Sequence, residues 1–435
     1  MLVVKDADKI PLAKAIFRGS GVKISNEGHR YLGAAIGQTS FVVKYAEEKI
    51  LKWVDDIKDL AKYAVEEPQL ALSAYTKALC HRWAFLQRTI PNISHLFTTI
   101  EDCLRETFIP AIIGRDISDI ERKIVSLPVR YGGLGIPNPV ETCEREYAAS
   151  LTVTEDLSDH IYNQVQDLSS FDFQKQQSTI KDLKKNKELS LNNEYKDLVA
   201  SIDNESLKRA LILSSEKGSG SWLTVLPLKD LGFCLNKQEF HDALCLRYGW
   251  NIPKMPSFCG CGQKNNVDHT LVCKKGGYVA MRHNNLRDLN ADMQKEVCRD
   301  VIIEPLLLPL DSEEIQGTQG DRSAPDISSW GLWSTFERTF FNVSVFHPNA
   351  PSYQTTDLDK LYRSQELEKM RKYNSRVITV ERGSFTPLIY TTFGGWGPQT
   401  TRYHKRLAEK LARKRNEDYD LVLNHMRTRI RFSLL

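Results

Sequence analysis

Apolar residues recur every three or four positions along the first third of the chain, which is the spacing that lines up one face of a helix. The pattern predicts helices over residues 41–68, 69–91 and 95–108, with prolines at 68, 91 and 110 close to their ends. Proline stops a helix because it lacks an N–H group and its ring crowds the preceding turn. We expect these apolar stripes to form a core rather than a cofactor site.

The pattern changes after this helical block. RYGGLGIPNP, from Arg130 to Pro139, combines three glycines with two prolines and predicts a loop, and its spacing is not that of a phosphate-binding glycine motif. Residues 167–203 have few large apolar side chains and predict an exposed helical connector. Beyond it, SWLTVLPL (221–228) predicts a short strand and LNKQEFHDALCLRYGW (235–250) a capped amphipathic helix.

Aromatic and β-branched residues mark strands in the last third of the chain. The segment around Asp326 and the run Phe340–Phe346 predict two neighbouring strands, with Asp326 and Asn342 at their ends. A helix is predicted over residues 361–372, followed by another strand over residues 377–380 that ends at Glu381.

Composition and charge narrow the possibilities. The chain has 435 residues, 41% of them hydrophobic, and this length predicts two to four domains. We expect neither a secretory leader nor a membrane span, because no long apolar run occurs. Net charge is only +4, but residues 401–435 contain ten Lys and Arg against four Asp and Glu. This end of the chain could face a polyanion, or it could be an ordinary solvated helix face.

Four residues have the spacing of a metal site. Cys259, Cys261, His269 and Cys273 form C-x-C-x7-H-x3-C in a polar, glycine-containing segment that cannot build an apolar core. Three thiolates and an imidazole complete a tetrahedral Zn²⁺ shell, and a closed shell favours a structural role. A disulfide is the alternative for the cysteines, and His283 is a second candidate ligand. We expect the other six cysteines to be reduced and buried.

Asp326 is the candidate for a different kind of metal site. Metal-assisted cleavage of a phosphodiester needs carboxylates that hold Mg²⁺, and usually a lysine beside them. In restriction-type nucleases a Pro-Asp pair is followed by (Asp/Glu)-x-Lys at a strand end, whereas this chain has Asn342 and Ser344 at those two places. Lys369, Lys372 or Glu381 could substitute if they reach the same pocket.

Several strings in order resemble the non-LTR retrotransposon polyproteins that carry a restriction-like endonuclease after their reverse transcriptase. SGVKISNEGHRYLGAAIG (20–37) is similar to the strand region just past that family's polymerase active site, the helical block to Gly114 to its thumb, and LPVRYGGLGIPNP (127–139) to the following loop. The later matches are WLTVLPLKDLGFCLNKQEFHDALCLRYGW, CGCG, DHTLVCKKGG, RHNNLRD, APDI, FFNVSVFHPNA and ERGSFTPLIYTTFGGWG. Together they span nearly the whole chain.

The resemblance implies an α+β fold in four parts. Residues 1–140 would be a thumb-like helical region, 141–250 a helical connector, 251–285 a CCHC zinc knuckle, and 286–435 a PD-(D/E)xK-type restriction-like endonuclease domain with a basic C-terminal helix. Asp326 matches the first catalytic aspartate of the family, and Asn342 departs from the second. Lys369 and Tyr373 match a lysine and a tyrosine on the helix that follows.

The same resemblance implies DNA and element RNA as partners, Mg²⁺ as the cofactor of nicking, and a nuclear location. The residues expected to contact nucleic acid lie in the RHNNLRD string and the basic end: Arg282, His283, Arg287, Lys405, Arg406, Arg413, Lys414 and Arg415. The aspartate pair of the polymerase is missing, so we do not expect polymerisation. Two hypotheses follow, which are a metal-dependent DNA endonuclease and a non-catalytic nucleic-acid-binding protein.

Overall fold

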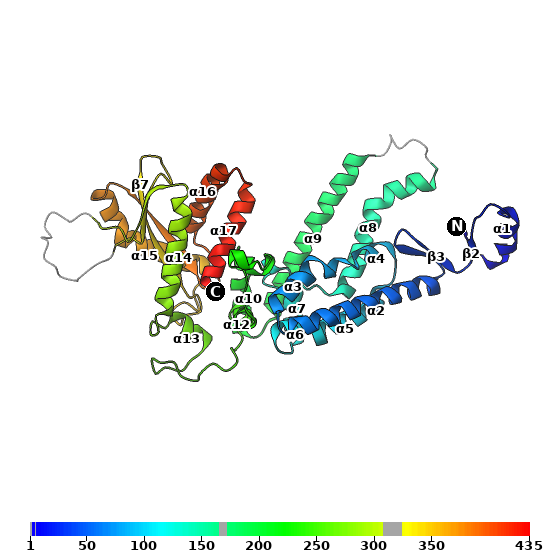
Figure 1. Cartoon of the computed structure of the whole chain (residues 1–435), viewed down its shortest axis with the longest axis horizontal. Coiled ribbons are helices and arrows are strands. Elements are labelled where there is room, and N and C mark those ends of the chain that lie inside the picture. Colours follow the sequence, from blue (N-terminus) through cyan, green and yellow to red (C-terminus); the bar gives the residue numbers. More distant parts are fainter. Residues whose placement is uncertain (1, 5, 165–171, 308–323) are drawn as a thin grey trace. The chain divides into compact units, whose positions relative to one another are not determined.

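The computed structural model describes residues 2–4, 6–164, 172–307 and 324–435 of the chain (Figure 1). The chain has a mixed α+β fold that divides into two compact units. The first comprises Met1–Pro128, Gly133–Ile202 and Leu235–His241, and the second comprises Val129–Gly132, Asp203–Cys234 and Asp242–Leu435. This division does not follow the boundaries expected at residues 140, 250 and 285, because short segments of one unit interrupt the other in sequence.

Helices make up most of the first unit. Its strands form two small sheets, in which β1 (Leu2–Val3) pairs in parallel with β2 (Ile24–Ser25), and β3 (Gly28–Tyr31) pairs antiparallel with β4 (Ala34–Gly37). The helices are α1 (Ile10–Ile16), α2 (Thr39–Ala64), α3 (Pro68–Lys77), α4 (Ala84–Thr89), α5 (Thr98–Cys103), α6 (Ile109–Ile113), α7 (Asp119–Ser126), α8 (Pro139–Tyr162) and α9 (Phe173–Ser201).

The apolar stripe predicted on the first long helix is buried, as expected. Ala46, Ile50, Ile57 and Ala64 of the predicted stripe on α2 are nearly inaccessible to solvent. The expected loop after Arg130 is confirmed as well. The connector is helical from Phe173 onward, whereas its first residues, 167–171, lie outside the described residues.

Two of the predicted helices differ from the structure. The second is divided into α3, a 3-10 turn over Leu79–His81 and α4. The third does not stop before Pro110, because a π-helical turn over Leu104–Phe108 leads directly into α6. Pro110 stands in the first turn of α6, where the missing N–H of a proline costs little.

A four-stranded mixed sheet forms the centre of the second unit. Its strands, in the order β5–β6–β7–β8, are β5 (Arg299–Ile303), β6 (Ile327–Trp330), β7 (Arg338–Phe346) and β8 (Ser384–Thr391). The first three run antiparallel and β8 runs parallel to β7. Ile327 pairs with Phe341, so Asp326, just before β6, lies opposite Asn342 in the middle of β7.

Helices cover both faces of this sheet (Figure 1). Phe341 and Val343 of β7 pack in one core cluster with residues of α14 (Tyr278–Lys295), α16 (Pro398–Arg415) and α17 (Tyr419–Leu434). Phe340 and Phe346 point the other way and pack against α15 (Leu358–Thr379). Side chains alternate along a strand, so Asn342 belongs to the face that α15 covers. The remaining helices are α10 (Glu205–Ser214), α11 (Ser221–Thr224), α12 (Lys237–Tyr248) and α13 (Val267–Val272).

The helix predicted over residues 235–250 is confirmed as α12, but two predicted strands are helical. Residues 221–224 form α11, in which the consecutive residues Trp222 and Leu223 are both buried. In a strand, the side chains of two consecutive residues would point to opposite faces of the sheet. Val377 lies on α15, where it continues the buried stripe one turn after Tyr373, and the strand begins only at Ser384.

The basic C-terminal end is also different from the single helix that was expected. Asn416 adopts a left-handed conformation (φ 55°) and caps α16, and the Asp418 side chain accepts from the first N–H groups of α17. The chain therefore turns back on itself, and the inner faces of α16 and α17 join the core. None of the helices in the described ranges is both long and apolar enough to cross a membrane.

Candidate metal centre and the Asp326 site

A short hairpin and one helical turn bring the four predicted metal ligands together. Phe258 and Lys264 form an antiparallel bridge around Cys259 and Cys261, and the N–H of Gly262 donates to the carbonyl of Cys259 at 2.8 Å. Gly262 has a φ of +87°, which glycine adopts without strain, and it closes a tight turn after Cys261. His269 and Cys273 lie one turn apart on α13 and directly after it.

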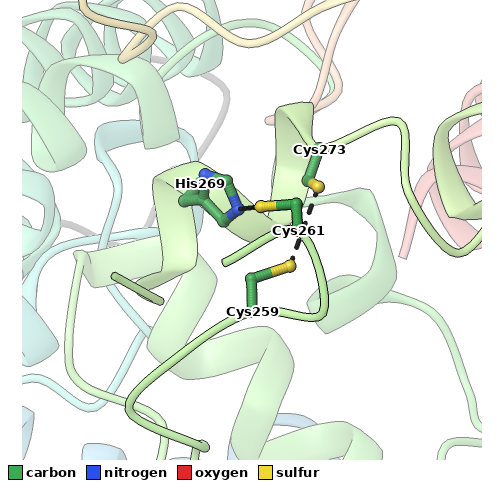
Figure 2. Close-up of side chains that lie close together, drawn as sticks. All are labelled: Cys259, Cys261, His269 and Cys273. Atoms are coloured by element: carbon green, nitrogen blue, oxygen red, sulfur yellow. Dashed lines mark hydrogen bonds between the residues drawn. The ribbon is translucent and has the colours of Figure 1, made fainter. Parts of the chain in front are cut away.

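The four ligand atoms lie within 4.8 Å of one another (Figure 2). The sulfur atoms of Cys259 and Cys273 are 3.7 Å apart, and Cys261 Sγ is 3.2 Å from His269 Nε2. A tetrahedral Zn²⁺ with Zn–S bonds of about 2.3 Å would space its sulfur atoms about 3.8 Å apart. A disulfide needs sulfur atoms about 2 Å apart, so that alternative is excluded. The group can bind a metal ion such as zinc.

The pKa values of two thiols in this cluster, Cys259 and Cys273, shift in opposite directions. Hydrogen bonds from the backbone N–H of Cys261 and from the Cys273 thiol lower the pKa of Cys259. A backbone N–H at Lys275 acts in the same direction on Cys273, but desolvation and the neighbouring Cys259 thiolate leave the pKa of Cys273 raised. Like charges at this distance repel each other, and a divalent cation would remove that repulsion.

The finger, defined here as residues 257–277, is joined to the sheet and to α14 of the second unit. Asp268 accepts from Nε2 of His347 at 2.8 Å, and the other ring nitrogen of this buried histidine is 2.8 Å from the Thr392 hydroxyl. Arg282 donates to the carbonyl of Leu271 at 3.1 Å. The finger is thus held by residues that follow β7 and β8 and by the first turns of α14.

The carboxylate of Asp326 lies at the junction of β6 and β7 and is only 13% exposed. Its Oδ2 accepts from Asn342 Nδ2 at 2.7 Å and from the backbone N–H of Val343 at 2.6 Å. The structure therefore brings together Asp326 and Asn342, the two residues expected at the centre of a cleavage site, although Asn342 is in mid-strand rather than at a strand end.

His283 lies beside the Asp326 carboxylate and is not part of the Cys/His cluster. Its Nε2 lies 3.4 Å from Asp326 Oδ2 and 3.0 Å from the Val343 carbonyl oxygen. The hydrogen bond to Asp326 raises the pKa of His283 above its ordinary value, although burial opposes this. The suggestion of His283 as an alternative zinc ligand is wrong, because α14 turns its imidazole toward the sheet.

The other residues expected at a cleavage site lie on α15. Lys369 is half-buried, and no hydrogen bond or ion pair joins it to Asp326 among the described residues. Tyr373 is buried in the apolar cluster with Phe340, and its ring centroid is 5.3 Å from that of Phe385. Tyr373 thus contributes to the core under α15.

Glu304 is a carboxylate that the sequence reasoning overlooked. Its backbone N–H donates to the Asp326 carbonyl at 2.9 Å, and its side chain is 69% exposed and paired with Arg287. Glu304 has a φ of +51°, which is unusual for a residue other than glycine. Glu381, by contrast, lies before β8 begins at Ser384. Asn342 pairs with Pro387 farther along β8, so the pairing does not place Glu381 beside Asn342. No local sequence pattern distinguishes Glu304, because only strand pairing places it beside Asp326.

The residues expected to contact nucleic acid fall into two groups. Several are already engaged within the second unit: Arg282 is buried, Arg287 pairs with Asp288 and Glu304, Arg406 pairs with Glu409, Lys414 binds the Glu296 carbonyl, and Arg415 forms a bidentate pair with Glu296. Lys405 and Arg413 are exposed on α16 without an ion pair among the described residues. The prediction is wrong for Arg282, whose guanidinium faces the protein interior.

Comparisons with known proteins do not identify a family for this chain. No protein-family model matches it, and no curated protein is significantly similar to it.

Proposed function

We propose that this chain binds nucleic acid through its second unit, with a zinc-stabilised finger beside a domain of PD-(D/E)xK type. The observation that carries the proposal is the outer face of α16, defined as residues 402, 405, 406, 409, 410, 413 and 414. These positions are exposed or half-buried, and all are Lys or Arg except Glu409. A row of cations on one helix face attracts a phosphate backbone without regard to sequence.

An aromatic side chain lies at the start of this face. The guanidinium of Arg402 is 5.1 Å from the ring centroid of Trp333, and both residues line a hollow of about 570 Å³ with Lys405 and Arg406. The indole N–H of Trp333 donates to the Thr386 hydroxyl at 3.1 Å, which holds the ring in place. Aromatic rings interleaved with cations offer both stacking and phosphate contacts.

The finger supports the same function. Its Lys264, Lys274 and Lys275 are exposed, and its Asp268 is hydrogen-bonded to His347. The bound metal ion would be structural, because four protein ligands leave no open position for a substrate. The resemblance to non-LTR retrotransposon proteins, stated above, points to the same class of partner.

Binding of a labelled DNA duplex and a labelled RNA strand, followed by fluorescence anisotropy, tests the proposal. The triple variant Arg402→Gln, Lys405→Gln, Arg413→Gln should bind at least about tenfold more weakly near 0.1 M salt, because each lost phosphate contact forfeits counterion release. Lys181→Gln, Lys184→Gln, Lys185→Gln is the matched control, since it removes the same charge from exposed positions of α9. Equal affinities of the two triple variants would refute the role of α16.

Metal-dependent cleavage of DNA is the second candidate function, and the Asp326 site is the observation that favours it. One oxygen of Asp326 is saturated by Asn342 and Val343, which leaves the other oxygen for a cation. A single carboxylate and a neutral amide bind Mg²⁺ weakly. Among the described residues, Glu304 is a carboxylate that would add to the site if it left Arg287.

Nicking of supercoiled plasmid by the purified protein with Mg²⁺ or Mn²⁺ tests this candidate. Asp326→Ala should abolish nicking and leave binding to DNA unchanged, while Asp359→Ala, an exposed residue on α15, serves as the control. Wild-type protein that binds DNA without nicking it would reject cleavage and retain the binding function.

A further inference from the structure

A second hollow in the same unit has a strongly basic lining. It has a volume of about 580 Å³ and lies between the segment from Glu216 to Val225 and helix α17. Arg130, Lys217 and Arg427 line it from three separate segments of the chain, and Ser221, Thr224 and Asn424 add polar groups. None of these residues belongs to the metal cluster, the Asp326 site or the outer face of α16.

More positive charge lies directly behind the lining. Arg247 donates to the carbonyl of Val129 at 3.1 Å, and a Cβ atom added at Gly220 would lie 3.5 Å from its guanidinium. Val129 and Gly220 both line the hollow. Arg431, one turn after Arg427 on α17, is 3% exposed and donates to the Thr392 carbonyl at 2.9 Å. Burial and the charge of Arg247 lower the pKa of Arg431 to about 9.

The lining itself has little negative charge. The one acidic residue of the lining, Glu216, is turned toward Tyr362, whose hydroxyl donates to it at 2.7 Å, and burial raises the pKa of Glu216 to about 7. His425, also in the lining, has a pKa lowered by burial and is neutral near pH 7. The buried Nε atoms of Arg427 and Arg431 have no hydrogen-bond partner among the described residues, although Arg427 donates through Nη1 to Asn424 at 3.3 Å. Partial burial of the Arg427 cation is unfavourable, and an anion in the hollow would offset this cost.

We propose that this hollow binds the phosphate group of a nucleotide unit, with Lys217 and Arg427 as its principal contacts and Arg130 at its rim. Guanidinium groups and hydroxyls are the usual partners of phosphate oxygens, and Arg427, Ser221 and Thr224 supply both types. The volume fits one nucleotide, since pockets for small ligands measure roughly 300–1,000 Å³. The phosphate could belong to a nucleic-acid strand or to a free nucleotide. The nucleic-acid strand is favoured because the same unit is proposed to bind nucleic acid, and the present proposal rests on that function.

The test measures binding of a labelled single-stranded oligonucleotide and, separately, of a deoxynucleoside monophosphate by calorimetry. Each substitution in the hollow has a control with the same loss of charge nearby. Arg427→Gln is compared with Arg429→Gln on the same helix, and Lys217→Gln with Lys229→Gln, because neither control residue lines the hollow. Lys217 is exposed, so its replacement should not disturb folding even if that of Arg427 does.

Each hollow variant should weaken oligonucleotide binding about tenfold relative to its control, as expected for loss of a charge-assisted hydrogen bond. Each should also make the slope of log affinity against log salt less steep by about one, which is the contribution of one phosphate contact. If the wild type binds the oligonucleotide and the variants match their controls, the phosphate site is refuted and the nucleic-acid-binding function stands. If only the monophosphate binds, and binding depends on Lys217 and Arg427, the site holds a free nucleotide and the proposed function fails. If neither ligand binds, both proposals are refuted.

Discussion

At the scale of single residues, the second unit contains ionisable side chains whose burial changes their protonation. Glu216 is packed so tightly that a Cβ atom at Gly395 would lie 2.3 Å from its carboxylate oxygens. Its pKa is raised to about 7, mainly by desolvation. His404 is fully buried beside Tyr390, and desolvation lowers its pKa to about 3. Both groups therefore prefer the neutral form in the folded state.

Glu216→Gln should remove a loss of stability that the wild type suffers as the pH rises. The folded protein holds the Glu216 proton up to about pH 7, whereas the unfolded chain releases it near pH 4.5. The free energy of unfolding therefore falls by about 3 kcal/mol in total between these two pH values, and it stays level at higher pH. Urea unfolding at pH 5 and pH 8 should show a smaller difference for Glu216→Gln than for the wild type. Glu368→Gln, on the exposed side of α15, should behave as the wild type does.

Asn342→Asp should make stability depend on a divalent cation. The new carboxylate would replace a hydrogen bond to Asp326 with repulsion between like charges, at a cost of roughly 1–3 kcal/mol. Mg²⁺ or Mn²⁺ bridging the two carboxylates would recover part of this loss, and thermal unfolding with and without the cation measures it. Asn163→Asp adds the same charge at an exposed position of the first unit. Equal effects of the cation on both variants would show that no site forms at Asp326.

At the scale of elements, the finger is too small to fold alone. Its hairpin has one isolated bridge and α13 has six residues, which is less than an isolated helix needs. A metal ion bound by the four ligands would supply the free energy that the finger lacks, together with the contacts to His347 and Arg282. The sheet beside it has its own apolar core, so we expect it to fold without the metal.

Removal of the metal should therefore unfold the finger and leave the sheet intact. A chelator, or the variant Cys261→Ser, should speed amide exchange at Asn265 and Cys273, whose N–H groups are bonded within the finger. Exchange in β7 and β8 should not change. Metal analysis should find one zinc ion per wild-type chain. Cys234→Ser, a half-buried cysteine outside the cluster, should keep its metal, and a chelator-resistant finger would contradict a structural ion.

At the scale of the whole molecule, charge is unevenly distributed rather than large. The net charge is only +4, yet the cations cluster on α16, in the finger and around the hollow beside α17. Arg406 and Arg415 are ion-paired, so the composition of the basic end alone overstates the charge available to a partner.

Binding of nucleic acid should accordingly weaken steeply as salt is added. With several phosphate contacts, a plot of log affinity against log salt should be linear, with a slope of about −0.9 per contact for duplex DNA. Affinities for duplexes of unrelated sequence should agree closely, because phosphate contacts do not specify bases. Anisotropy titrations between low and moderate salt measure both quantities. Binding that is insensitive to salt would show that the cations identified here are not the contacts.

The sequence alone determined the features that depend on near neighbours. The stripe of α2 follows from its periodicity. The four candidate metal ligands could be found because all lie within fifteen residues and their geometry needs only one hairpin and one helical turn. The helix α12 was predictable from its capping residues, since Asn236 and Glu239 satisfy each other's backbone N–H groups.

Only the tertiary structure decided what depends on distant partners. Whether residues 221–224 and 377–380 are helix or strand was settled by packing, because short apolar runs fit both. The contact of His283 with Val343 spans 60 positions, and the pairing of Arg415 with Glu296 spans 119. A one-dimensional pattern shows that a cation or an imidazole is present, but burial and hydrogen bonding in the folded chain determine whether it is free to meet a ligand.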